Sequence, residues 1–458
     1  MKLVPDFQLL TPTNAVFVLI AFEGPDAYSQ AGGLGVRMSG LGQTLAQLGY
    51  STHQFFIGDP SLPGEELTMD KRLVLHRWSQ WISASCPAGV YDGEEAKHDD
   101  LTRSLPAYAL ERVILPAIAA GRRPVILLEE WQTAEAACAL SDALRDRGVR
   151  DRAVLLWNAN NPYGFDRIDW QRLARSVSIT VVSRYMRSIV RSCGVDARVI
   201  PNGISADLLS PVARADVRFV RAALGQAPRA GLLFKMARWE RDKGWGQAID
   251  AVWRLRHMGR RIVFVGRAGG TSGRGGALAA DAHARGLRAV HLEDETEFRA
   301  QLGPLTRAGA DVISLGFGVT PDLARTLFAA ADGVLANSVS EPFGLVGLEA
   351  MAAGGIAYTG GTGEDYAIAG HNAIVLQTLD PNEIVAYWDD LSSSPEHTAR
   401  LRREARKTAR EYEWSRVIQR FLTSAATAAS SMEPPGNQVG ELDDRAPEDD
   451  QATQSRLD

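Results

Sequence analysis

Short apolar runs alternate with segments of helical periodicity along most of this 458-residue chain. Each run has the length of one strand and few polar residues, which is typical of strands buried on both faces of a parallel sheet. Because parallel strands need a crossover connection, usually a helix, the alternation predicts doubly wound α/β structure. A chain of this length exceeds one ordinary core, so two such domains are expected.

The predicted strands fall into two sets separated by a turn signal. Pro201, Asn202 and Gly203 stand in sequence after the first set, and such a cluster interrupts regular structure. The strands expected before it are 16–22, 53–57, 125–128, 154–157 and 179–182. Those expected after it are 232–236, 262–265, 312–315, 334–336, 356–358 and 374–376. We therefore expect an N-terminal domain over 1–203, a C-terminal domain over 204–412, a last helix over 413–430 and a tail over 431–458.

Charge and composition exclude several classes of function. The net charge is −5, and residues 433–458 carry eight acidic and two basic side chains, so the tail contributes −6 and the rest about +1. The acidic tail is expected to be disordered, and no basic stripe supports nucleic-acid binding. The apolar runs are too short for a transmembrane segment, and no secretory signal is evident. Three widely spaced cysteines indicate reduced thiols in a cytoplasmic protein, without zinc-ligand spacing.

One segment of the second half places two carboxylates eight residues apart, Glu341 and Glu349. Glu341 follows a predicted buried strand, and open α/β sheets bind ligands at the carboxyl ends of their strands. Pro342 suits a first helical position, and the N–H groups near Gly344 and Leu345 are expected to form an anion site at the helix start. Glu349 on the same helix would reach a polyol. The segment predicts a site for a nucleotide sugar.

Two cations follow the first predicted strand of the second set. Arg238 would project from the strand end and Lys243 from the next loop, both toward the same edge of the sheet. A diphosphate leaving group gains charge as its glycosidic bond breaks, and fixed cations stabilise that change. We expect Arg238 and Lys243 to bind the donor phosphates and, with Glu341, to act in catalysis.

A glycine-rich turn, Gly32-Gly33-Leu34-Gly35, lies between the first predicted strand and a helical stretch. Glycine allows close approach of a ligand to the backbone, and the following helix start would present free N–H groups. Gly33 is therefore a candidate donor-binding residue.

The Glu341–Glu349 segment closely resembles the E-x7-E signature of the retaining glycosyltransferases of family 4. The resemblance extends from about Val16 to Leu422. It implies the α/β GT-B fold: two Rossmann-like domains facing across a cleft, with a C-terminal helix that crosses back to the N-terminal domain. It also implies that Glu341 lies beside the donor sugar and that Glu349 holds the ribose hydroxyls.

Further positions match the family's pattern. Ala237-Arg238 and Lys243-Gly244 resemble its phosphate-binding Arg and Lys-Gly. Phe317 and Val319 lie in a turn that resembles its nucleobase-binding turn. The stretch 360–366 resembles its Gly-Gly-x-x-Glu loop, which implies a role in shaping the phosphate site.

The N-terminal half departs from the related glycogen synthases. Their His-Asp-Trp-His-Thr-Ala stretch aligns with Glu129-Glu130-Trp131-Gln132-Thr133-Ala134, so both histidines are replaced. Their Lys-Thr before the glycines is replaced by Gln30-Ala31. Both departures argue against glycogen synthase activity. The candidate sugar or acceptor ligands at this edge are Glu129, Glu130, Asn158 and Asn160.

The resemblance implies a retaining hexosyltransferase that uses a nucleotide diphosphate sugar and a carbohydrate or other small-molecule acceptor. No cofactor and no metal are expected, because the cations and the helix start can neutralise the diphosphate. Two alternatives stay open. One is a glucan synthase that uses ADP-glucose, and the other is a catalytically silent GT-B protein that binds nucleotide sugars.

Overall fold

The computed structural model describes residues 10–225, 230–269 and 276–430. Its N-terminal part is a sheet with strand order β3-β4-β2-β1-β5-β6-β7-β8. Every neighbouring pair is parallel except β3 and β4. The elements are β1 Ala15–Ile20, α1 Gly33–Gln47, β2 Ser51–Ile57, β3 Glu65–Thr68, β4 Leu73–Trp78, α2 Gln80–Ser83, α3 Glu94–Ala109, α4 Leu115–Ala119, β5 Arg123–Glu129, α5 Ala134–Asp146, β6 Val154–Ala159, α6 Trp170–Ser176, β7 Ser178–Val181, α7 Arg184–Ser192 and β8 Arg198–Val199.

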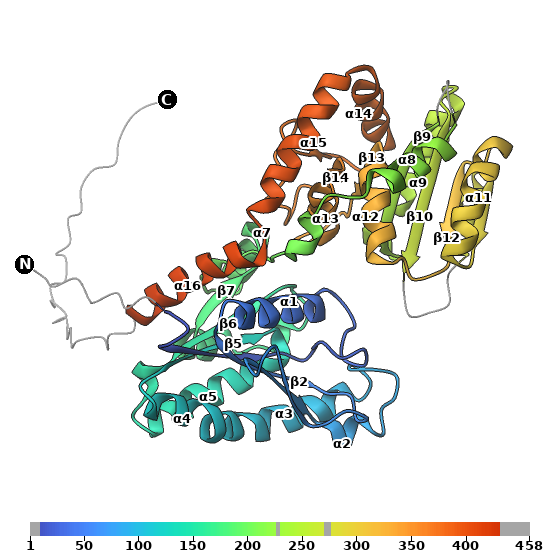
Figure 1. Cartoon of the computed structure of the whole chain (residues 1–458). Helices are drawn as coiled ribbons and strands as arrows, with labels where there is room; N and C mark the ends of the chain where they lie inside the picture. Colours follow the sequence, from blue (N-terminus) through green and yellow to red (C-terminus); the bar gives the residue numbers. More distant parts are fainter. Residues whose placement is uncertain (1–9, 226–229, 270–275, 431–458) are drawn as a thin grey trace, which may run out of the picture.

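The C-terminal part is a second, wholly parallel sheet with order β11-β12-β10-β9-β13-β14-β15. Its elements are α8 Arg214–Ala223, β9 Gly231–Arg238, α9 Trp245–His257, β10 Ile262–Gly269, α10 Ala277–Ala284, β11 Ala289–Leu292, α11 Glu295–Ala308, β12 Val312–Leu315, α12 Pro321–Ala330, β13 Gly333–Ala336, α13 Leu345–Ala352, β14 Ala357–Thr359, β15 Ile374–Val375, α14 Pro381–Ser393 and α15 Pro395–Arg410. Figure 1 shows the two sheets as separate bodies, each flanked by helices. The predicted two-domain α/β architecture is confirmed.

The last helix, α16 (Trp414–Ser430), crosses back to the N-terminal sheet (Figure 1). Its apolar side chains Val417, Ile418 and Phe421 are buried in the same cluster as Phe17 of β1. Hydrophobic burial of this face therefore fastens the end of the chain to the first domain, as predicted.

The chain passes between the domains twice, and the two passages lie side by side. Ile204 N–H donates to Tyr412 O at 2.8 Å, and Trp414 N–H donates to Ile204 O at 3.0 Å. A β-carbon placed on Gly203 would lie 2.3 Å from the Trp414 ring, so only glycine fits this passage. The division at 203/204 stays a prediction, and the acidic tail lies outside the described residues.

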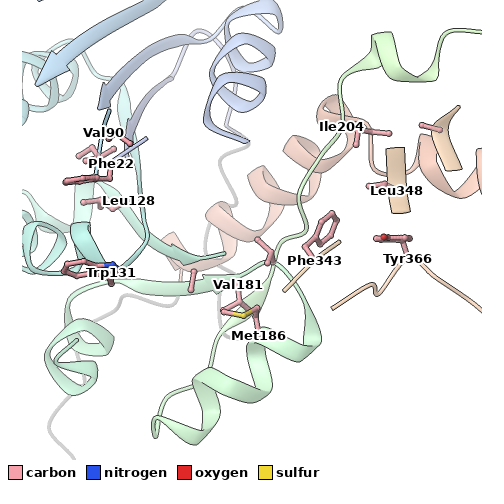
Figure 2. Close-up of a cluster of buried hydrophobic side chains, with 14 of the residues drawn as sticks. Phe22, Val90, Leu128, Trp131, Val181, Met186, Ile204, Phe343, Leu348 and Tyr366 are labelled. Atoms are coloured by element: carbon pink, nitrogen blue, oxygen red, sulfur yellow. The ribbon is translucent and has the colours of Figure 1, made fainter. Parts of the chain in front are cut away.

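The two domains also share a buried apolar cluster close to Glu341. Val181 and Met186 of the first domain belong to the same cluster as Phe343, Leu348 and Tyr366 of the second. Figure 2 shows Phe343 between Met186 and Tyr366. The segment that carries the predicted site is therefore packed against the N-terminal domain.

Two polar contacts reinforce this packing. Tyr185 of α7 hydrogen-bonds to Ser340 at 2.8 Å between the two hydroxyl oxygens. Arg184 donates to Asp365 from its backbone N–H at 2.8 Å and from Nε at 3.1 Å. Ser340 precedes Glu341, and Asp365 lies on the loop after β14, so both loops are fixed relative to the first domain. Among the described residues, no helix is long and apolar enough to cross a membrane.

Candidate active site

Lys243 and Glu341 meet at the carboxyl ends of two neighbouring strands, β9 and β13. Lys243 Nζ lies 3.1 Å from Glu341 Oε2 and 3.1 Å from Asp242 Oδ2. Burial by itself lowers the pKa of Lys243, but the charges and hydrogen bonds of Glu341 and Asp242 raise it above its ordinary value. The ammonium group is therefore held in its charged form beside a carboxylate that stays partly exposed.

The loop after β14 holds Glu341 by its backbone. Glu341 N–H donates to Thr362 Oγ1 at 2.9 Å, and Glu341 O accepts from Gly363 N–H at 2.9 Å. Thr362 is held in turn by Glu364, whose Oε2 accepts from the Thr362 N–H at 3.1 Å. Burial raises the pKa of Glu364 to about 7. This Gly-rich stretch supports the Glu341 segment directly.

Helix α13 begins later than its sequence suggested. The prediction that Pro342 takes the first helical position is wrong, because α13 starts at Leu345 with Gly344 as its N-cap. Gly344 has a φ of +78°, a conformation that a residue with a β-carbon rarely adopts, so the turn ends at the glycine and the helix starts after it. Glu349 lies on α13 as predicted, and burial raises its pKa to about 7.

Arg238 is not joined to this pair. It is the last residue of β9, its side chain is 66% exposed, and its Nη1 lies 3.0 Å from Glu240 Oε1. Arg238 and Lys243 both lie at the carboxyl end of β9, but the guanidinium group of Arg238 is turned toward Glu240. An exposed ion pair of this kind is weak, so Arg238 can exchange Glu240 for another anion.

The glycine-rich turn lies at the interface between the domains. A β-carbon placed on Gly33 would lie 3.9 Å from Leu345 Cδ1, so two predicted donor-binding residues face each other across it. The expectation of free N–H groups here is wrong for Ala31, Gly32 and Gly35, which all donate to Glu23 Oε2 at 2.9–3.1 Å. Tyr91 donates to the other oxygen of Glu23 at 2.6 Å. Glu23 is therefore an internal anion at the start of α1.

Phe317 and Val319 follow β12, and both are partly buried against the apolar core. In the sheet, β10 and β9 lie between β12 and β13. At about 4.8 Å per strand, the β12 and β13 ends are about 14 Å apart. The predicted base-binding turn and Glu341 thus lie along one edge of the sheet, separated by two strands.

The four predicted acceptor-side residues form one network at the ends of β5 and β6. Glu129 accepts from Asn158 Nδ2 at 2.8 Å, from Asn160 Nδ2 at 2.6 Å and from Arg37 Nε at 3.0 Å. Glu130 accepts from the Asn160 N–H at 2.7 Å. The sequence placed these residues together correctly, but nearly all of their side-chain polar atoms already bond to one another or to Arg37, Asn161 and Thr180. Their role as sugar ligands stays a prediction.

Burial of Glu130 has a measurable consequence for stability. Burial, together with the nearby charges of Glu129 and Glu23, raises its pKa from 4.5 to about 8 against the lowering effect of the Asn160 hydrogen bonds. Between these values the folded state binds more protons than the unfolded state, so the free energy of unfolding falls as pH rises from about 4.5 through about 8. The slope from this group approaches about 1.4 kcal/mol per pH unit.

Glu130→Gln is expected to flatten this slope in urea titrations between pH 5 and 9, because the amide does not titrate. Glu95→Gln, which removes an exposed carboxylate of the same domain, should keep it. An unchanged slope in Glu130→Gln would show that Glu130 is already ionised at low pH.

Several residues that build the site were not predicted. Glu23 and Arg37 lie beside the recognised glycine-rich turn, but their partners are distant in sequence or lack a motif of their own. Thr362 lies within the recognised stretch 360–366, but its hydrogen bond to Glu341 was not predicted. Lys235 gave a signal, since it is the one charged residue within the apolar run 231–236. In the described part of the chain, no group of three or more His, Cys, Asp or Glu side chains could hold a metal ion.

Solved structures share this architecture over nearly the whole chain. Sucrose-phosphate synthase from Thermosynechococcus elongatus is 18% identical, with a TM-score of 0.63, and the match covers 91% of this chain and 100% of that one. The catalytic domain of starch synthase IV from Arabidopsis thaliana, bound to ADP and acarbose, is 17% identical, with a TM-score of 0.63 and the same coverage. HepE from Anabaena, in complex with UDP and glucose, is 15% identical, with a TM-score of 0.59, covering 90% and 100%. No curated protein sequence matches significantly.

Two parallel Rossmann-like sheets, the returning helix α16 and these matches define the class: the protein has the GT-B fold. Within that class, residues 216–408 match the family described as "Glycosyl transferases group 1". Residues 216–408 are therefore similar to a group 1 glycosyl transferase domain.

Proposed function

We propose that this protein is a retaining glycosyltransferase that moves a hexose from a nucleotide diphosphate sugar to a hydroxyl group of a carbohydrate or other small acceptor. The observation that carries the proposal is the ion pair of Lys243 with Glu341 at the carboxyl ends of β9 and β13. Gly33 and Leu345 border the same region from the two domains. The UDP and ADP found in HepE and starch synthase IV support a nucleoside diphosphate as the donor's leaving group.

In this reaction, the acceptor oxygen bonds to the anomeric carbon as the bond from that carbon to the diphosphate oxygen breaks on the same face. The acceptor proton passes to the departing phosphate oxygen. Lys243 would stabilise the charge that develops on the diphosphate, and the N–H groups at the start of α13 would add to this effect. Glu341 would orient the hexose and stabilise the positive charge that builds up on its ring. Arg238 would leave Glu240 to bind the diphosphate.

The donor is placed along the edge of the C-terminal sheet in this proposal. The base would lie at Phe317 and Val319, the ribose at Glu349, the diphosphate at Lys243 and Arg238, and the hexose at Glu341. The proposed base, diphosphate and hexose positions follow the ends of β12, β9 and β13, which lie in this order along the sheet, whereas Glu349 lies on the helix after β13. The acceptor would approach from the N-terminal domain, where Glu129, Glu130, Asn158 and Asn160 lie.

The test is nucleotide release from UDP-, ADP- and GDP-hexoses by the purified protein, with and without a panel of sugar acceptors. One donor should release its nucleotide in an acceptor-dependent manner, and Glu341→Gln should abolish release while the nucleotide still binds. Ser338→Ala, a change on the same loop away from the ion pair, is the control and should keep turnover. If the wild-type protein and Glu341→Gln both bind a nucleotide sugar but neither turns it over with any acceptor, the result would instead support a silent binding protein.

A further inference from the structure

Lys235 is a buried lysine in the strand that leads to the candidate site. It lies within β9 and is 1% exposed. Its Nζ donates to Leu335 O at 2.9 Å and to Asn337 Oδ1 at 2.6 Å, and it lies 5.2 Å from the centre of the Trp245 ring. Burying a charged amine is costly unless an opposite charge compensates it, and both acceptors here are neutral.

A second buried lysine shows what full compensation by hydrogen bonds looks like. Lys97 of α3 donates to Tyr28 Oη at 2.7 Å and to the carbonyl oxygens of Gly89 and Val90, each at 3.1 Å. These are three acceptors for the three N–H bonds of an ammonium group. Within the described part of the chain Lys235 has two acceptors, Leu335 O and Asn337 Oδ1, which is the number that a neutral amine can satisfy with its two N–H bonds.

The charged groups that face Lys235 are those of the candidate site. Burial and, to a smaller extent, the charge of Lys243 lower the pKa of Lys235 to about 7, against the raising effect of Glu341. The side chains packed against it from α9 and from the end of β13, Trp245 and Asn337, are uncharged. The protonation of Lys235 therefore depends on the charge balance around Lys243 and Glu341.

Hydrogen bonds also join Lys235 to the turn that carries Lys243. Asn337, which accepts from Lys235, donates through Nδ2 to Gly244 O at 3.1 Å and to Gln247 Oε1 at 2.8 Å. Gly244 follows Lys243 directly and has a φ of +67°. A β-carbon on Gly244 would lie 2.2 Å from Asn337 O, so the turn and Asn337 are in tight contact.

We propose that Lys235 is a positioning residue for the donor diphosphate and that it takes up a proton when the diphosphate binds beside Lys243. This inference rests on the proposed function. A bound diphosphate brings negative charge near Lys235 and also offsets the positive charge of Lys243. Both effects favour the ammonium form of Lys235. Because the linkage is reciprocal, nucleotide affinity falls as pH rises from about 7, with a slope of up to about tenfold per pH unit.

The experiment is calorimetric titration of the full chain with UDP, ADP and GDP at pH 8, each in two buffers of different ionisation enthalpy. The difference in apparent binding enthalpy gives the number of protons taken up. Wild type should take up a large part of one proton more than Lys235→Gln, which keeps N–H donors but cannot be charged. Other titrating groups, such as Glu349, contribute to both proteins and cancel in the difference.

Two further variants separate this effect from a general loss of structure. Lys97→Gln should match wild type in proton uptake. Lys235→Arg, which is charged throughout, should bind the nucleotide at pH 8 at least as tightly as wild type but without the extra proton, and so restore what Lys235→Gln loses. Thermal unfolding identifies any variant that does not fold.

The possible outcomes differ for the two proposals. Equal proton uptake by wild type and a folded Lys235→Gln or Lys235→Arg overturns the role of Lys235 and leaves the proposed function standing. Failure of wild type to bind any of the three nucleotides overturns the proposed function and this inference with it.

Discussion

Replacing Lys243 with methionine is expected to lower the turnover of the nucleotide sugar by about 100- to 1,000-fold, the usual effect of removing one fixed group that stabilises transition-state charge. Lys243 is the buried cation of the candidate site, and the Glu341 and Asp242 carboxylates keep it charged. Its charge would count most as the diphosphate departs, so kcat should fall more than KM rises. Steady-state kinetics with the identified donor measure both constants.

Arg241→Met is the matched control, because it removes a cation from the same short turn, Arg241–Lys243, at an exposed position. Its turnover should stay within about twofold of wild type, since exposed charges are strongly screened. Equal losses in the two variants would mean that general positive charge attracts the donor and that Lys243 has no specific role. Retained turnover in Lys243→Met would contradict the proposed leaving-group contact.

Local sequence pattern was sufficient for most of the fold. Both sets of predicted strands match strands of the two sheets, because each is a buried apolar run with little polar content. The missed strands have different patterns. β3 (Glu65–Thr68) is polar and lies at the edge of its sheet, β8 (Arg198–Val199) has two residues, and β4 and β11 carry histidine within their apolar residues. β3, β8 and β11 lie at sheet edges, where a strand need not be buried on both faces. Such a strand lacks the continuous apolar run by which the other strands were predicted.

The candidate site was predicted less completely, for reasons of distance along the chain. Glu341 and Lys243 were each recognised, but their ion pair joins residues 98 positions apart and depends on β9 and β13 being neighbours. At Glu23 the motif was recognised, but the group that occupies it was not. A glycine-rich turn indicates available N–H groups, but whether a ligand or the protein's own carboxylate takes them depends on tertiary structure.

Gly363→Ala is expected to destroy most of the activity although the residue carries no functional group. A β-carbon there would lie 2.3 Å from Glu341 O and 2.2 Å from Pro342 O, and both are backbone atoms that cannot rotate away. The Glu341 segment must shift, and its hydrogen bond with the Gly363 N–H would be lost. A displacement of about 1 Å at a reacting centre can cost about 100-fold in rate. Overpacking of this kind also destabilises a fold by about 1–3 kcal/mol.

Gly361→Ala is the control, because its β-carbon would meet its nearest neighbours, in Val375 and Leu376, at an ordinary 3.9 Å. Turnover and the urea midpoint should stay close to wild type in this variant, whereas Gly363→Ala should lose both turnover and stability. Nucleotide binding distinguishes the cause, because Lys243 belongs to another segment and a folded Gly363→Ala protein should still bind UDP, ADP or GDP. Wild-type turnover in Gly363→Ala would show that the position of Glu341 tolerates movement and that its carboxylate does not act on the hexose.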